Sequence, residues 1–261
     1  MKVLKKIAIW TMTIVYLLLI AGFVSNKYES QLCNGIEITI IDSLNSGFLL
    51  EEDILKILEN NNIHYLGEPL YGIDLIKLEK TILSNQIVKD CRAYTSANGM
   101  LYIDISQREP FVRIIDMNGN GYYIDVEGNI LSLSPRFTPH VLVVNGYIKT
   151  PFAIGSAVNV NNLADNRYEK LIKSIYTLSL YIFQHELWNS QFVQMYMNKS
   201  GEMELIPRVG PHIILFGTLE NYSEKLDKLE IFYKEGLNII GWNQYVKINL
   251  KYKDQVVCTK I

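Results

Sequence analysis

The residues that most often do chemistry in proteins are few in this sequence and lie far apart. Its 261 residues include three cysteines and four histidines, and no two cysteines stand in a C-x-x-C spacing. Zinc sites and thioredoxin-like redox centres depend on such close spacing, so the sequence supports neither. The motifs G-x-S-x-G and H-E-x-x-H do not occur, which removes the usual signals of a serine hydrolase or a zinc protease. We therefore expect no metal and no cofactor.

Carboxylates are the next candidates for chemistry. Asp104, Asp116 and Asp125 fall in expected strands or turns, and none has a second acid at a spacing typical of a general acid–base pair. A net charge of -2 gives no reason to expect a nucleic acid partner. The sequence therefore predicts a protein that is not an enzyme and has no small-molecule substrate. A membrane-anchored enzyme outside the cytoplasm is the competing class.

The chemistry that remains is that of backbone groups near the end of the chain. Residues 245–252 alternate between apolar and polar side chains, which predicts a strand buried on one side. A second strand is expected over 255–260, and its terminal position predicts a sheet edge, where unpaired N–H and C=O groups can pair with a strand of another chain. The alternative is a hairpin that only completes its own sheet. The residues expected on the buried side of the first strand are Val246, Ile248, Leu250 and Tyr252.

The N-terminal segment predicts a membrane anchor. Residues 7–24 carry no charge, and at ~1.5 Å per residue this segment reaches about 27 Å as a helix, close to the hydrocarbon thickness of a bilayer. Lysines at positions 2, 5 and 6 precede it, so the positive-inside rule places the tail 1–6 in the cytoplasm and the rest of the chain outside. A cleaved signal peptide is the alternative, but no A-x-A-like site follows.

The next segment, residues 32–109, predicts a small domain of order β-α-α-β-β. A strand is expected over Gly35–Ile41, and two short amphipathic helices follow, the second capped by Asp74. Two strands then meet at Asn98-Gly99, where both positions tolerate a positive φ. This order and size resemble a POTRA domain, a module that binds other polypeptides outside the cytoplasm.

Residues 110–261 predict a mixed β-sheet domain with flanking helices. Asp125 and Gly128 are suited to a strand–turn–strand unit, since one supplies a local acceptor and the other a positive φ. Helices are expected over 165–183 and 223–235, the second between an N-cap at Ser223 and a C-cap at Gly236. Its lysines, Lys225 and Lys228, are interpreted as a solvated face. The whole chain is thus expected to be α+β, with a single N-terminal transmembrane helix.

Three stretches of the sequence are similar to motifs of the FtsQ/DivIB family of cell division proteins. Together they follow one predicted membrane helix and a POTRA-like domain, which is the layout of that family. Asn249 and Lys251 depart from it, because Asp and Arg are common at those positions. The stretches are the junction Arg108-Glu109-Pro110, the turn motif from Tyr122-Tyr123-Ile124-Asp125 to Gly128 and Ile130, and the terminal Ile248-Asn249-Leu250-Lys251-Tyr252 with Gln255-Val256-Val257.

The resemblance implies a scaffold of the bacterial division machinery that links early and late division proteins. It implies a location in the inner membrane at the septum, with most of the chain in the periplasm. It further implies that the POTRA domain contacts FtsK and that the terminal strand binds the FtsB/FtsL coiled-coil pair by strand addition. The alternative is a POTRA-bearing envelope protein acting in secretion or outer-membrane assembly, although no second β-α-α-β-β repeat occurs. The partner-binding residues implied are Leu250, Tyr252, Gln255, Val256, Val257 and Thr259.

Overall fold

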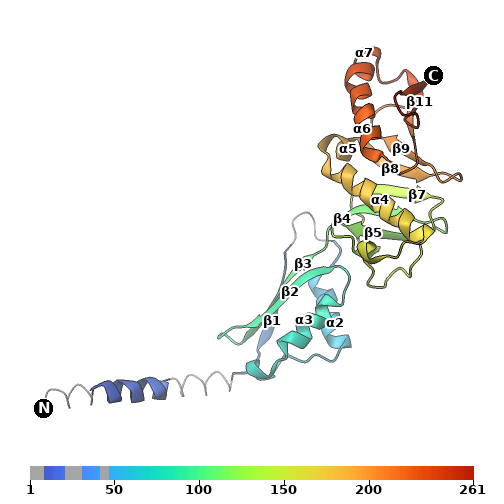
Figure 1. Ribbon diagram of the computed structural model, residues 1–261. Coiled ribbons are helices and arrows are strands. Elements are labelled where there is room, and N and C mark those ends of the chain that lie inside the picture. Colours follow the sequence, from blue (N-terminus) through green and yellow to red (C-terminus); the bar gives the residue numbers. More distant parts are fainter. Residues whose placement is uncertain (1–8, 21–30, 42–46) are drawn as a thin grey trace. The chain divides into compact units, whose positions relative to one another are not determined.

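The computed structural model of the chain describes residues 9–20, 31–41 and 47–261 (Figure 1). They belong to two compact units, Met1–Gln107 and Arg108–Ile261. Each unit combines a β-sheet with helices, so the predicted α+β class is confirmed.

The structure describes only part of the predicted membrane anchor. Residues 9–20 are helical, whereas the tail 1–6 and the remaining positions of the predicted span 7–24 lie outside the described residues. Within the described ranges, no helix combines the length and the apolar character that crossing a membrane requires.

The first unit has the predicted β-α-α-β-β order. Its three strands form a sheet in the order β1-β3-β2, with β1 parallel to β3 and β2 antiparallel to it. Alternate residues of the central strand, among them Leu101, Ile103 and Ile105, are fully buried in a core with both α-helices. The elements are β1 Gly35–Ile41, α2 Glu51–Asn60, the 3-10 turn η1 Leu70–Gly72, α3 Leu75–Leu83, β2 Val88–Thr95 and β3 Met100–Gln107.

Side chains close to each helix start explain why the two helices begin where they do. The carboxylate of Asp53 accepts a hydrogen bond from the N–H of Leu50 (3.0 Å) at the start of α2. Asp74 accepts one from the N–H of Lys77 (2.9 Å), which confirms it as the predicted cap of α3. Both bonds satisfy backbone donors that a helix or its cap would otherwise leave unpaired.

The second unit is built on a nine-stranded sheet in the order β12-β11-β10-β9-β8-β7-β4-β5-β6. Three antiparallel groups, β4–β5–β6, β8–β9–β10 and β11–β12, are joined through parallel pairs. The two edges of this sheet are therefore β6 and β12. The strands are β4 Pro110–Ile115, β5 Gly121–Asp125, β6 Ile130–Ser132, β7 Leu142–Gly146, β8 Phe192–Met197, β9 Met203–Pro207, β10 Ile213–Gly217, β11 Tyr245–Asn249 and β12 Val257–Lys260.

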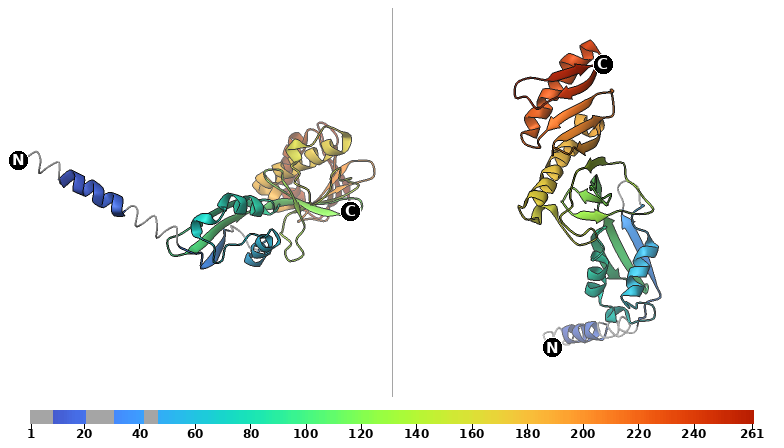
Figure 2. Two further views of the ribbon diagram at one scale, coloured as in Figure 1. Left: turned by 90° about the horizontal axis from the view of Figure 1, so that it is seen from below. Right: turned by 90° about the vertical axis from the view of Figure 1, so that its right-hand side faces the viewer.

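Helices lie along one face of this sheet and share a single core with it (Figure 2). A parallel connection requires a crossover, and here α4 connects β7 to β8 while α6 connects β10 to β11. Asn166 caps α4, because its side chain accepts from the N–H groups of Tyr168 and Glu169 (both 3.1 Å). The helical elements are η2 Val160–Asn162, α4 Arg167–Gln184, α5 Glu186–Gln191, α6 Tyr222–Ile231, the π-helical turn η3 Phe232–Leu237 and α7 Asn238–Ile240.

The caps predicted for the last long helix are wrong. Asn221 occupies the N-cap in a left-handed conformation (φ 50°), so Ser223 already lies inside α6. Gly236 lies within the π-helical turn, and the chain leaves helical structure only at Gly241 (φ 101°). Tyr233 and Leu237 are both buried, so packing against the core holds the chain helical past the glycine.

The tight turns of the two sheets repeat one geometry. In each, a glycine with a positive φ of 78–86° donates its N–H to the carbonyl three residues earlier, at 3.0–3.1 Å. The predicted hairpin at Asn98-Gly99 is one of them, but only Gly99 has a positive φ, as in a type I turn followed by a left-handed residue. These turns span residues 96–99, 116–119, 125–128 and 198–201.

Candidate functional site

The predicted terminal strand is found at the edge of the large sheet. It is shorter than expected, four residues rather than six, and pairs with β11 in antiparallel register. Thr259 lies opposite Lys247, and Val257 lies opposite Asn249. Among the described residues, no strand pairs with the outer side of β12.

Hydrogen bonds at the end of β12 show which backbone groups face outward. The N–H of Ile261 donates to the carbonyl of Gln244 (3.2 Å), so the backbone N–H and C=O of Ile261 point toward β11. Backbone N–H and C=O groups of successive strand residues point to opposite sides, so those of Thr259, two residues earlier, also point toward β11. The residues that direct N–H and C=O groups to the free edge are Cys258 and Lys260.

The other edge of the same sheet is covered. Beside β6, the N–H of Ile130 donates to the carbonyl of Val158 (3.0 Å) and the N–H of Val160 donates to the carbonyl of Gly128 (2.8 Å). The segment 158–160 thus uses backbone groups that an edge strand would otherwise expose. Proteins commonly protect sheet edges in this way, so the bare edge at β12 is a specific difference between the two ends.

The predicted partner-binding side chains divide into exposed and buried groups. Gln255, Val257 and Thr259 are exposed, whereas Val256 is partly buried against the core. Leu250 is fully buried, so its side chain supports the hairpin from inside and presents nothing to a partner. Cys258 is partly buried and also packs against the core.

The prediction that Tyr252 lies with Leu250 on the buried side of one strand is wrong, because Tyr252 is exposed and both residues follow the end of β11. Strand β11 ends at Asn249, whose side-chain oxygen accepts from the N–H of Lys251 (3.0 Å) and turns the chain out of the ladder. Tyr252 follows in the bend, with 48% of its surface accessible. It therefore lies beside the start of the hairpin and not on the ladder itself.

Lys228 on α6 holds this bend in place. Its ammonium group donates to the carbonyls of Leu250 (3.3 Å), Tyr252 and Lys253 (3.0 Å). The interpretation of Lys225 and Lys228 as a solvated face is therefore wrong. Sequence reasoning had no signal for this contact, because the acceptors are backbone carbonyls more than 20 residues away in the chain.

The neighbouring Lys225 is likewise engaged. It donates to the carbonyl of Thr218 (2.7 Å) and lies 4.9 Å from the ring centroid of Phe216. Burial lowers the pKa of Lys225, and the positive charge of Lys228 lowers it further. Both lysines thus fasten α6 to the strands below it.

The junction and the turn motif, predicted from separate stretches, form one cluster. Arg108 binds the Asp125 carboxylate (3.1 Å) and the Glu127 carboxylate (2.8 Å), and Pro110 lies opposite Asp125 in the β4–β5 pair. The other side-chain oxygen of Asp125 accepts from the N–H groups of Glu127 (3.0 Å) and Asn129 (2.8 Å). Gly128 completes the turn with φ 86°. This cluster fixes the closed edge of the sheet.

Residues that the sequence analysis missed hold the same turn from outside. The side-chain amides of Asn159 and Asn161 donate to the carbonyl of Glu127 at 3.0 and 3.1 Å. The hydroxyl of Tyr176 on α4 donates to the carbonyl of Val126 (2.9 Å). These acceptors are again backbone groups.

Titratable groups in this unit are used structurally. Asp116 accepts from Asn118 and Asn120 in its own turn, in the same manner as Asp125. His212 is buried against Tyr233, with 3.0 Å between the ring nitrogen and the hydroxyl oxygen, and burial lowers the pKa of this histidine. In the part of the chain that the structure describes, no three His, Cys, Asp or Glu residues are grouped as a metal site would require.

Comparison with protein families connects these units to known ones. Residues 109–259, more than half of the chain, match the family described as FtsQ/DivIB, C-terminal related. The chain belongs to the FtsQ/DivIB family. Residues 31–106 match the POTRA-like domain. No curated protein matches the chain.

The family assignment confirms the resemblance predicted from the sequence. The FtsQ/DivIB match begins beside Arg108 and ends within β12, so it includes both the closed and the bare edge of the sheet. FtsQ/DivIB and POTRA-like domains are non-catalytic scaffold types, which supports a role in cell division as a scaffold.

Proposed function

We propose that this FtsQ/DivIB protein is a non-enzymatic division scaffold that captures a partner strand at β12. The bare edge carries the proposal, because no strand pairs with the outer side of β12 among the described residues, whereas the segment 158–160 bonds to the start of the opposite edge. Added strands gain main-chain hydrogen bonds, and neighbouring side chains supply specificity. Tyr252 and Val257, both partly exposed beside the edge, are suited to that second task.

The partner we propose is the FtsB/FtsL coiled-coil pair, and FtsK for the POTRA-like domain. Family membership supports both assignments. We further propose that the apolar residues 7–24 anchor the chain in the inner membrane at the septum. The absence of charge in that segment supports a membrane anchor. The lysines before it support an N-terminus in the cytoplasm.

The sharpest test uses the backbone N–H of Lys260, which faces the free edge of β12. Proline there removes a backbone N–H that faces the free edge, where edge strands tolerate proline. We expect Lys260→Pro to weaken capture of purified FtsB/FtsL by the full chain at least tenfold, with no change in unfolding temperature. Lys260→Ala is the matched control, because it removes the same side chain and keeps the N–H.

Two results would contradict the proposal. Normal capture of FtsB/FtsL by Lys260→Pro would exclude pairing at β12. In cells, an even membrane signal from an N-terminal fluorescent fusion, with normal division after depletion, would exclude the division role and favour envelope assembly. Midcell recruitment with filamentation after depletion is the expected outcome.

A further inference from the structure

A pocket of about 480 Å³ opens in the second unit, away from the residues that form the β12 edge. It lies where the turns after β4, β7 and β8 meet the beginning of α4 and the end of β10. Its wall combines the rings of Tyr147 and Tyr168 with apolar side chains such as Leu171 and Met197. Pockets of this volume bind compact organic molecules.

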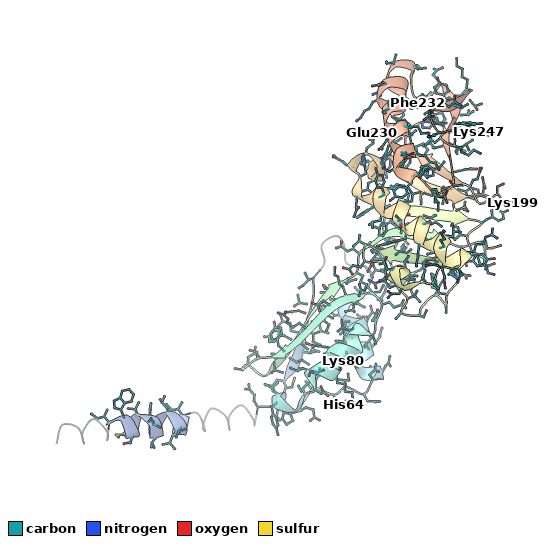
Figure 3. All side chains as sticks on the ribbon, in the orientation of Figure 1. His64, Lys80, Lys199, Glu230, Phe232 and Lys247 are labelled. Carbon is teal, nitrogen blue, oxygen red and sulfur yellow. The ribbon has the colours of Figure 1, made fainter. Side chains whose placement is uncertain are left out.

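Positive charge gathers around this pocket from three separate segments. Lys149 follows β7, and Arg167 and Lys170 belong to the first turn of α4. Lys199, labelled in Figure 3, lies in the turn between β8 and β9. Glu220 is the single carboxylate of the lining. The pocket therefore carries a strong excess of positive charge, although the whole chain is slightly acidic.

These cations are not neutralised by the protein. Over the described ranges, none of the four forms an ion pair, whereas Lys173, about one turn further along α4, pairs with Asp165 (3.1 Å). Like charges gathered around one cavity repel each other, and that repulsion is relieved when an anion enters. The arrangement is thus suited to bind negative charge.

Two of the ammonium groups are held in position by the tyrosine rings. The Lys149 ammonium lies 4.9 Å from the ring centroid of Tyr168, and that of Lys199 lies 5.6 Å from the centroid of Tyr147. Cation–π contacts of this kind restrain flexible lysines at the rim. The site does not depend on the helix N-terminus, because Asn166 already accepts from the first N–H groups of α4.

We propose that this pocket binds an organic phosphate. A phosphate group carries about 1.5 to 2 negative charges and three acceptor oxygens, so it can engage cations from several directions. A single carboxylate of an acidic peptide would leave most of these cations unpaired. The tyrosine rings and apolar side chains would contact the organic body to which the phosphate is attached. A soluble phosphate monoester offers this chemistry in full, and the phosphodiester of an anionic phospholipid headgroup offers it in part, with a single negative charge.

The experiment uses the full chain in phosphatidylcholine nanodiscs. Calorimetric titration with glycerol 3-phosphate, with glycerol as the neutral control, measures binding of a soluble ester. Hydrogen exchange of residues 198–201, in nanodiscs with and without phosphatidylglycerol, measures protection by a headgroup. The pocket variant is Lys149→Gln with Lys199→Gln. The matched control is Lys247→Gln with Lys260→Gln, which removes the same charge at β11 and β12, strands that contribute no residue to the pocket lining. Lys247 is labelled in Figure 3.

We expect the pocket variant to weaken the phosphate response at least tenfold, while the control variant and the unfolding temperatures stay unchanged. A calorimetric response to glycerol 3-phosphate would identify a soluble ester as a sufficient ligand. Protection by phosphatidylglycerol alone, again lost in the pocket variant, would identify the headgroup. The proposal is overturned if neither probe binds, if both variants respond equally, or if a glutamate-rich peptide binds the pocket more tightly than either phosphate.

Discussion

The two edges of the nine-stranded sheet are stabilised by different means. At β6, an aspartate turn, an arginine and the segment 158–160 cover the strand with side-chain and backbone bonds. At β12, a single lysine of α6 fastens the bend, and no strand of the described residues pairs with the outer side of β12. One edge is bonded to a neighbouring segment of the chain, and the other has no such neighbour in the part that the structure describes. This difference supports the proposal that the β12 edge pairs with a partner strand.

The largest change in unfolding free energy is expected from substitutions in the turn that fixes the closed edge at β6. Asp125→Ala removes a buried acceptor of the turn and one of the two carboxylates that bind Arg108, which keeps Glu127, so we expect unfolding to become easier by about 2–4 kcal/mol. Asp116→Ala is the matched control, because Asp116 caps an equivalent turn and forms no ion pair there among the described residues. Its loss should cost about 1–3 kcal/mol. Equal losses in chemical denaturation would show that Arg108 adds nothing to the closed edge.

Two glycines in equivalent turns allow a second test of the closed edge, with a smaller expected loss of unfolding free energy. Gly119 and Gly128 share a left-handed conformation (φ 85° and 86°), and alanine in that region costs roughly 1–2 kcal/mol. A Cβ at Gly119 would meet open space, whereas one at Gly128 would lie 2.7 Å from the side-chain nitrogen of Asn161. We expect Gly128→Ala to lower the unfolding free energy by about 1 kcal/mol more than Gly119→Ala. A larger loss at Gly119 would contradict the role of the asparagines in covering β6.

The smallest effect is expected at the open edge. Lys228→Met releases the carbonyls of Leu250, Tyr252 and Lys253, with a local cost of about 1–2 kcal/mol. Amide exchange in β12 should accelerate about tenfold while the core amides of β8 keep their rates. Lys234→Met is the control, since the ion pair of Lys234 within the described ranges is with Glu230 on the same helical segment. Unchanged exchange in β12 would show that the bend holds without Lys228.

Much of the fold follows from local signals in the sequence. The turns at 96–99 and 125–128 were predictable because glycine and an Asx acceptor specify them within four residues. The same local logic failed at Gly236, where buried Tyr233 and Leu237 override the glycine. Tertiary packing of this kind leaves no trace in a short window of residues.

The candidate site was predictable in outline, because the terminal position of the last strand predicts a sheet edge and alternation predicts a buried Leu250. Alternation does not show that β11 ends at Asn249, and so it places Tyr252 wrongly on the buried side. The role of Lys228 was hidden because its acceptors are carbonyls, which every residue possesses. The cationic pocket was hidden because Lys149, Arg167 and Lys199 are brought together only by the turns around them.

The shortness of β12 has a consequence for self-association. A long bare edge would invite two copies of the chain to pair with each other, and growing stacks of such pairs are a route to aggregation. A strand of four residues that includes the exposed Lys260 offers a second copy few hydrogen bonds and adds like charge to such a pair. A foreign segment that brings its own apolar contacts gains more from the edge than an identical copy does. The short strand therefore limits pairing between identical copies and still leaves the edge available to a different segment.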